Sequence, residues 1–275
     1  AYFGSIDENS ATRSGWTRVG RRLKRGMDPK DAPILFEAGA DDVQATGGII
    51  DPLFWNGGPD EKPIEFFTVI HEIDRMSVHV RDGQGALRRL DLPDRIDVTD
   101  NHRHLLWRAK SDERYPTGSL ILQDFIPYSD EPLGAARVLF SPEHGQTVTQ
   151  FSLFKTWGAF VVSDVMVPRL FLIDLTKPDA QPQELQLPST LQTVGFRTLD
   201  ADLTRGEEIL TVIGQGFLQP YGTWRLDLTD RSHSPELVAT GVSPAYFDAE
   251  GMQSELLQAT SEDGTKIPYH IVYPK

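Results

Sequence analysis

The sequence predicts an all-β protein with a β-propeller architecture. Two observations carry this prediction: short strands follow one another along almost the whole chain, and pairs of strands recur at intervals of roughly 40 to 57 residues. A repeat of about 40–50 residues with about four strands per unit is typical of a propeller blade. A β-sandwich with chance spacing is the alternative interpretation.

The individual strands are predicted from alternating apolar and polar residues. Residues 77–81, 170–175 and 223–228 alternate in this way, which places one side of each strand against a core. Glycine, proline, aspartate and serine separate these runs, as turns require. No segment predicts a convincing helix, because the nearest candidates, residues 135–140 and 254–259, are too short to be stable alone.

Five outer hairpins and eight inner strands are expected. The last two hairpins are close copies, since each reads strand, Asp-Leu-Thr, polar loop and strand, with Asp174 and Asp227 at matching places. The hairpins cover residues 17–39, 77–93, 118–141, 169–188 and 221–241, and the inner strands cover 44–51, 65–72, 95–99, 104–110, 147–153, 159–163, 194–200 and 208–214. Residues 1–246 are therefore predicted to form about five four-stranded blades: four full blades and, first in the chain, the last three strands of another.

The end of the chain does not continue this four-stranded repeat. Residues 247–275 contain strands on either side of Asp263-Gly264, which predicts a hairpin closed by a two-residue turn. No third and fourth strands follow it, so we expect a linker and a hairpin that leads into another domain. The chain opens with Ala1 rather than methionine and its first residues already read as strand, so we expect a fragment of a longer protein.

Composition excludes several classes of function. The 275 residues carry 27 basic and 40 acidic side chains, and a net charge of −13 argues against nucleic acid or an anionic membrane as a partner. The absence of cysteine excludes disulfides, thiol nucleophiles and thiolate metal sites. No window reaches the roughly 18 apolar residues of a membrane span, and no signal peptide is recognisable. We expect a soluble protein, and cytoplasm and periplasm both remain open.

Three segments resemble one known family. Residues 259–272, Ala-Thr-Ser-Glu-Asp-Gly-Thr-Lys-Ile-Pro-Tyr-His-Ile-Val, closely resemble the junction between propeller and α/β-hydrolase domain in the prolyl oligopeptidase family of serine peptidases. Residues 14–26 are similar to that family's Ser-Gly-Tyr-Pro-Arg and Lys-Arg-Gly segment, and residues 115–120 to its Tyr-Pro-Ala-Gly-Ser-Leu. The three segments occur in the family's order and near its spacing.

The resemblance implies an architecture and an activity. In this family a seven-bladed propeller sits as a lid on the peptidase domain and admits short peptides to a Ser-Asp-His triad. This chain is expected to lack that triad. Ser243 lies in Gly241-Val242-Ser243-Pro244-Ala245, the nearest approach to a Gly-x-Ser-x-Gly elbow, but the last glycine is missing and Pro244 removes an amide that the elbow uses. The resemblance alone implies a preference for cleavage after proline, and it does not separate prolyl oligopeptidase from oligopeptidase B.

The expected partners follow from the same resemblance. They are the α/β-hydrolase domain of a longer parent chain and short peptide substrates, and no cofactor or metal is expected. The fragment alone is expected to be inactive, and open propeller edges could pair two copies. Two other functions remain open: a stand-alone propeller that binds a protein or peptide, and a five-bladed glycosidase. The glycosidase would need acids that face a central tunnel, for which the candidates are Asp51, Asp97, Asp164 and Asp200.

Four further groups are candidates for sites. His102 and His104 are expected to share one strand face and could coordinate a metal ion, although no third ligand is evident. His71-Glu72 lacks the second histidine of a zincin helix and lies in a strand-like run. A basic cluster in the first hairpin is either a docking patch or a solvated face balanced by acids; it comprises Arg13, Arg18, Arg21, Arg22, Lys24 and Arg25. The acids at residues 248–251 and 262–264 are expected to form turns rather than a calcium site.

Overall fold

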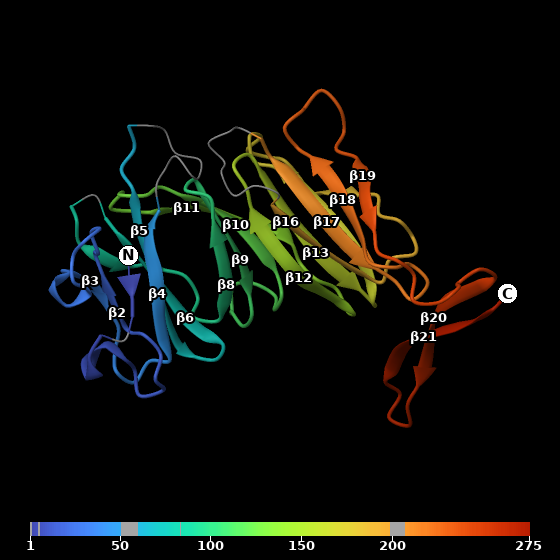
Figure 1. Ribbon diagram of the computed structural model, residues 1–275, viewed down its shortest axis with the longest axis horizontal. Helices are drawn as coiled ribbons and strands as arrows, with labels where there is room; N and C mark the ends of the chain where they lie inside the picture. Colours follow the sequence, from blue (N-terminus) through green and yellow to red (C-terminus); the bar gives the residue numbers. More distant parts are fainter. Residues whose placement is uncertain (1, 5, 51–59, 83, 199–206) are drawn as a thin grey trace. The chain divides into compact units, whose positions relative to one another are not determined.

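The computed structural model describes residues 2–4, 6–50, 60–82, 84–198 and 207–275. These residues form antiparallel strands throughout, and their helical content is limited to the short 3-10 turns Glu8–Ser10 and Pro29–Asp31 (Figure 1). In these ranges we find no helix with the length and apolar character needed to cross a membrane. The chain divides into two compact units, residues 1–141 and 142–275, and each is described by itself.

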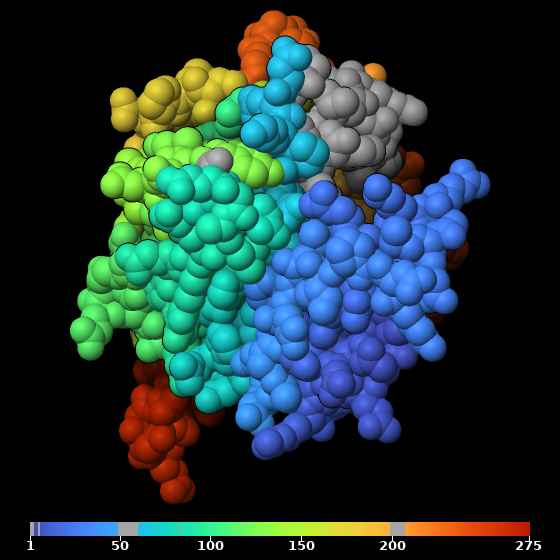
Figure 2. All heavy atoms as spheres, turned by 90° about the vertical axis from the view of Figure 1, so that its left-hand side faces the viewer, coloured from blue at the N-terminus to red at the C-terminus, as the bar shows by residue number. Residues whose placement is uncertain are grey.

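The first unit contains three sheets. A three-stranded sheet has the order β1 (Tyr2–Phe3), β2 (Val19–Arg21) and β3 (Ile34–Glu37). A four-stranded sheet follows with β4 (Gln44–Ile50), β5 (Ile64–Glu72), β6 (Arg75–Arg81) and β7 (Leu87–Arg89). The third sheet has four strands, β8 (Ile96–Asp100), β9 (His104–Ala109), β10 (Leu120–Phe125) and β11 (Leu133–Phe140). Figure 2 shows a face of this unit on which the residues of β1–β4, in blue, lie beside those of the following strands.

The second unit repeats the four-stranded pattern twice. One sheet contains β12 (Gln146–Leu153), β13 (Trp157–Asp164), β14 (Val167–Asp174) and β15 (Gln183–Leu185). The next contains β16 (Thr193–Thr198), β17 (Ile209–Gln215), β18 (Gly222–Asp227) and β19 (Leu237–Val242). A two-stranded sheet of β20 (Met252–Thr260) and β21 (Lys266–Pro274) follows. In all six sheets each strand pairs with its neighbour in sequence.

The structure confirms the predicted strands. Each of the five outer hairpins is present, and so is a strand at each of the eight inner positions, although Asp51 and residues 199–200 lie outside the described residues. The hairpin at the end of the chain is also present, but its turn was wrongly predicted. The amide of Ser261 donates to the carbonyl of Thr265 at 3.0 Å, and Gly264 takes a left-handed φ of 85°. The loop therefore has more than two residues, because the pairing closes at Ser261 and not at the residues flanking Asp263-Gly264.

The sheets are held by apolar faces on both sides. The first six residues of β13 are all buried, which explains its near-continuous apolar sequence. In the second unit one core joins the two four-stranded sheets through Phe154, Trp157, Phe196 and Trp224. In the first unit the rings of Phe36 and Phe67 stack with centroids 4.8 Å apart, so β3 packs directly against β5.

A polar network reinforces the junction between the sheets of the second unit. Arg231 pairs with Asp174 at 2.7 Å and lies over the ring of Trp157, 4.8 Å from its centroid. The Trp157 indole donates to the carbonyl of Leu228 at 3.0 Å. The carboxylate of Glu208 accepts from the amide of Thr156 at 2.7 Å. These contacts tie the Asp-Leu-Thr segment at the end of β14 to the polar loop that follows β18.

Candidate functional site

The most prominent candidate site is an aromatic pocket in the second unit. It has a volume of about 320 Å³ and is formed by the β17–β18 loop and the segment after β19. Its lining is largely apolar, and the residues are Gln215, Gly216, Phe217, Leu218, Gln219, Pro220, Tyr221, Ala245, Tyr246, Phe247 and Ala249. A second pocket, lined by β16 and β17, shares Gln215 and Tyr221 with it. The two hollows therefore meet along one edge.

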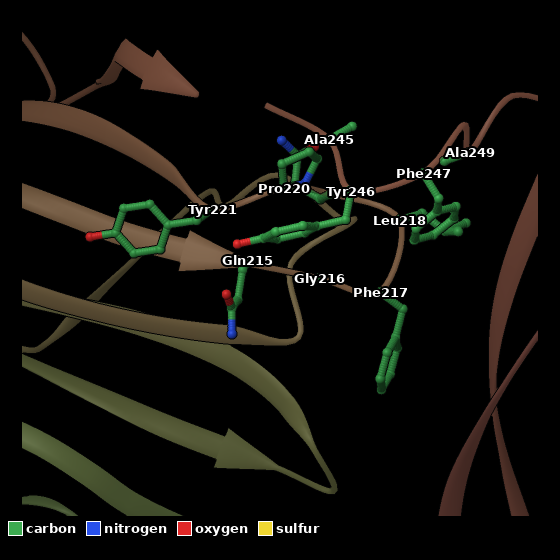
Figure 3. Close-up of a pocket in the computed structure, with 11 residues that line it drawn as sticks. Gln215, Gly216, Phe217, Leu218, Pro220, Tyr221, Ala245, Tyr246, Phe247 and Ala249 are labelled. Carbon is green, nitrogen blue, oxygen red and sulfur yellow. The ribbon is translucent and has the colours of Figure 1, made fainter. Parts of the chain in front are cut away.

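The loop chemistry explains why these rings remain outside the core. Gly216 begins the loop and its amide bonds to the carbonyl of Gln219 at 2.8 Å, so residues 216–219 form a tight turn. The turn carries Phe217 and Leu218 outward, and Figure 3 shows Tyr246 reaching over the loop on the side of Gln215 and Tyr221. Tyr246 is 99% exposed, and Phe217, Tyr221 and Phe247 also count among the exposed large apolar side chains. Exposed apolar side chains that cluster in this way are typical of interaction surfaces.

The hairpin of β20 and β21 also exposes apolar side chains. The ring of Phe217 lies 5.0 Å from the imidazole of His270 on β21, centroid to centroid. Ile267, Tyr269 and Val272 of the same strand are exposed as well. We use the name aromatic surface for the side chains of Phe217, Tyr221, Tyr246 and Phe247.

Ser243 borders this pocket with a backbone role. Its amide donates to the carbonyl of Tyr221 at 2.8 Å, which extends the β18–β19 pairing by one bond. Pro244 follows and lacks an amide that could continue it. The chain leaves the sheet at this point and turns into the pocket wall.

The histidines at the β8–β9 turn are placed differently from the prediction. His104 begins β9, whereas His102 lies in the turn with a φ of 72° and is almost fully buried. The reason is Asn101, whose side-chain oxygen accepts from the amides of Arg103 at 3.2 Å and His104 at 2.9 Å and so closes the turn. The prediction that both rings share one strand face is therefore wrong. The described ranges contain no group of three or more His, Cys, Asp or Glu residues that could hold a metal ion.

The same turn contains a carboxyl group that the sequence did not single out. Asp100 ends β8, and burial raises its pKa to about 6, an effect that a hydrogen bond from the amide of His102 opposes. Burial also lowers the pKa of His102 and of His104. The run Asp-Asn-His-Arg-His contains no apolar residue that would signal burial, yet the side chains of Asn101 and His102 are almost fully buried.

Two of the four proposed tunnel acids are paired with cations. Asp97 accepts from Arg108 and from Lys110, the latter at 2.7 Å, and although burial acts in the opposite direction these hydrogen bonds lower its pKa. Asp164 pairs with Arg169 at 3.1 Å. A glycosidase's general acid needs a raised pKa, whereas the pKa of Asp97 is lowered. Asp51 and Asp200 lie outside the described residues.

The remaining candidates have structural partners. In the basic cluster, Arg13, Arg18 and Arg22 pair with Asp41, Glu37 and Glu65, as the solvated alternative expects. Asp248 and Asp263 each accept an amide two residues further on, from Glu250 and Thr265, both at 2.9 Å, so these acids form turns. His71 lies in β5, and its contacts are described below.

Comparison with known proteins places these features in context. No family model matches the chain. Among curated proteins, an uncharacterized peptidase (y4nA) of Sinorhizobium fredii is 25% identical over 280 residues, which cover 96% of this chain and 36% of that protein. An uncharacterized peptidase (RP174) of Rickettsia prowazekii is 23% identical over 214 residues, covering 74% of this chain and 28% of that protein.

Solved structures agree over almost the whole chain. A post-proline cleaving enzyme from Rickettsia typhi matches 98% of this chain and 39% of its own, with a TM-score of 0.76 at 20% identity. Oligopeptidase B from Trypanosoma brucei matches 96% of this chain and 36% of its own, with a TM-score of 0.65 at 14% identity. The chain has the propeller fold of prolyl oligopeptidases. The resemblance read from the three sequence segments is thereby confirmed, and the chain spans 28–39% of the length of these relatives.

Proposed function

We propose that this chain is the propeller part of a serine-type oligopeptidase that hydrolyses short peptides. The observation that supports this most strongly is the match to the Rickettsia typhi post-proline cleaving enzyme over 98% of the chain. The relatives are peptidases and are much longer, so the catalytic Ser, Asp and His would belong to an α/β-hydrolase domain in the rest of the protein. Residues 1–246 would form the blades and residues 247–275 the connection to that domain.

In this proposal the aromatic surface is where the catalytic domain packs. The large unmatched share of the relatives supplies an occupant for it, and the surface lies beside the hairpin whose sequence resembles the family's interdomain junction. Apolar side chains as exposed as Tyr246 stabilise a contact when another surface covers them. The propeller would then act as a size filter that admits unfolded peptides and excludes folded proteins.

In this proposal the reacting groups would all lie in the α/β-hydrolase domain and none in the propeller. The serine hydroxyl attacks the scissile carbonyl, and the histidine takes its proton and returns it to the leaving amine. Water then hydrolyses the acyl-enzyme and regenerates the serine, and backbone amides stabilise the oxyanion of each step. The β-sheets contribute no reacting group in this scheme and need no cofactor. Cleavage after proline is proposed from the relative's described activity and not from any residue of this chain.

A peptidase assay tests this proposal. A longer protein that contains this chain and a Gly-x-Ser-x-Gly segment should cleave a proline-containing chromogenic peptide, and a serine-directed inhibitor should abolish cleavage. The 275-residue chain alone should be inactive. Inhibitor-sensitive cleavage by the pure 275-residue chain would refute the assignment of the triad to another domain.

Substitution of the aromatic surface tests the packing interface. Tyr246→Ser in the longer protein should weaken the contact between propeller and catalytic domain, so limited proteolysis near residues 243–251 should become faster. Ile73→Ser is the matched control, because Ile73 is also 99% exposed but lies in the turn between β5 and β6. Equal proteolysis of the two variants would contradict the proposed position of the interface.

A stand-alone binding propeller is the second candidate, and the aromatic pocket favours it. A concave apolar site with a few polar groups, here Gln215 and the two tyrosine hydroxyls, is typical of a ligand site. In that case the isolated chain would bind peptides without cutting them, and the Tyr246→Ser variant would lose binding. A gene that ends just after residue 275 would favour this function over the peptidase.

A further inference from the structure

A chain of hydrogen bonds in the first unit has no role in the proposed function. Nδ1 of His71 lies 2.7 Å from a carboxylate oxygen of Asp42, and Nε2 of the same ring lies 2.8 Å from the hydroxyl of Ser77. That hydroxyl lies 2.9 Å from Nε2 of His79. We call these four side chains the relay.

The relay joins three parts of the unit. Asp42 belongs to the connection between β3 and β4, and its other oxygen accepts from the amide of Gly39 at 2.8 Å. His71 is the unpaired residue of a β-bulge in β5, and Ser77 and His79 lie two residues apart on β6. The ring of His79 packs on Phe36 of β3, with centroids 5.3 Å apart. The relay therefore lies in the β4–β7 sheet and the connection that leads to it, and it contacts the β1–β3 sheet through the packing of His79 on Phe36.

When both rings are neutral, the donor and acceptor roles in the three hydrogen bonds determine which ring nitrogens carry a proton. The Asp42 carboxylate can only accept, so Nδ1 of His71 carries a proton and Nε2 of His71 accepts from the Ser77 hydroxyl. The Ser77 oxygen is then free to accept from Nε2 of His79. All three contacts are satisfied, and the donors point in one direction, from His79 toward Asp42.

One added proton can be accommodated, but a second cannot. If His71 becomes an imidazolium, its Nε2 donates to the Ser77 oxygen, and the Ser77 hydroxyl must reverse and donate to Nε2 of a neutral His79. If both rings are charged, both donate to Ser77, and its hydroxyl hydrogen has no acceptor left within the relay. Two imidazolium groups would also face each other across a single oxygen atom.

The surroundings disfavour charge on His79 in particular. Burial lowers the pKa of its imidazole, the positive charges of Arg89 and His71 lower it further, and Asp42 opposes them. Ser77 is buried as well, so water has little access to repair a broken contact. Charging both histidines would therefore break a hydrogen bond within the relay.

We propose that the relay is an acid-sensitive link, which holds the β1–β3 sheet against the β4–β7 sheet at neutral pH and releases it when both histidines bind protons. The open form binds at least one proton more than the closed form, so acid favours opening. This device is independent of any peptidase function of the longer protein.

Amide hydrogen exchange measures the link directly. The amide of Ala45 on β4 donates to the carbonyl of Thr17 across the boundary between these two sheets at 2.8 Å, so its exchange reports opening once the intrinsic pH dependence of exchange is corrected. Below pH about 6.5, the open population should rise by up to about tenfold per pH unit, because one extra proton is bound on opening. Amides of the β13–β14 pairing in the second unit serve as the internal reference.

Two substitutions separate the relay from general acid sensitivity. His79→Gln keeps a donor toward Ser77 but cannot titrate, so the pH dependence of Ala45 amide exchange should disappear. His144→Gln removes an exposed histidine and should behave like the unsubstituted protein. The same pH slope in the His79→Gln variant and the unsubstituted protein would overturn the proposal.

Histidine titration by NMR provides a second measurement. In the folded His71→Gln variant the charge of His71 is gone, so the His79 imidazole should titrate at a higher pH than in the unsubstituted protein. Ser77→Ala keeps both rings and removes the oxygen that joins them, so the His79 titration should change in this variant as well. A His79 titration that is unchanged in both variants would refute the relay.

Discussion

Replacement of Asp174 by asparagine is the sharpest test of how the second unit is held together. The carboxylate pairs with Arg231 at 2.7 Å and accepts from the hydroxyl of Thr176 at 2.6 Å and its amide at 3.0 Å. Although burial acts in the opposite direction, these bonds lower the pKa of Asp174 from 3.8 to about 2. The asparagine side chain would keep the shape of the aspartate and lose its charge.

The magnitude follows from that pKa. A fall from 3.8 to about 2 corresponds to about 2.4 kcal/mol of stabilisation above pH 5. Solvent screening reduces this value, since Lys177, another partner, is 74% exposed, and we expect a loss of about 1.5 kcal/mol at pH 7. Because the folded-state pKa is depressed, the contribution is complete above the unfolded value of 3.8 and disappears as the pH falls toward 2.

Urea denaturation of the Asp174→Asn variant provides the measurement. Its midpoint should fall at pH 7 with an unchanged slope, and the difference from the unsubstituted protein should shrink to roughly half by pH 3. Asp227→Asn is the matched control, because Asp227 occupies the equivalent place in the repeat but is more exposed, and its pair with Arg225 should contribute less than about 1 kcal/mol. Equal losses in the two variants, or a loss for Asp174→Asn that does not depend on pH, would refute this reasoning.

Three further substitutions test the first unit. Phe67→Ala removes a fully buried ring that stacks on Phe36, and calorimetry should show a loss of about 3–5 kcal/mol. Asp100→Asn should raise the urea midpoint at pH 7 and change it little at pH 4, because burial raises the pKa of Asp100 to about 6 and the folded state loses stability as the pH rises through that value. Gly47→Ala should lower the melting temperature, since Gly47 has a φ of 141° and a Cβ there would lie 2.7 Å from Cα of Phe67. No loss in the Gly47→Ala variant would contradict the close approach of β4 to β5.

The strands were predictable because their signal is local. The strand predicted at residues 170–175 is present as β14, but both of its sides are buried: Leu170 and Leu172 lie in the core with Trp157, and Phe171 stacks on Phe160 of β13. The Asp-Leu-Thr repeat also correctly marked equivalent positions, since Asp174 and Asp227 each accept the amide two residues further on. Local sequence patterns predict a strand and the turn that follows it. They do not predict which distant residues a long loop brings into contact with that strand.

The candidate sites were less predictable for that reason. Asp42, His71 and Ser77 meet only because the β3–β4 connection folds back onto a bulge, and their separation in sequence gives no sign of it. The turn at His102 was misread because its geometry depends on the side chain of Asn101. The aromatic surface could have been recognised from the sequence, because Phe217 and Tyr221 lie between Gly216 and Gly222, in a stretch where turn residues are expected.

The order of strands within the sheets has a consequence for how the chain folds. Every pairing among the named strands joins neighbours in sequence. Each sheet can therefore form as a meander before the next one is complete, at a low cost in loop-closure entropy. Low contact order of this kind favours rapid folding for an all-β protein, with sheets added one after another. Sheets that emerge from the ribosome first could thus be paired while the later ones are still being synthesised.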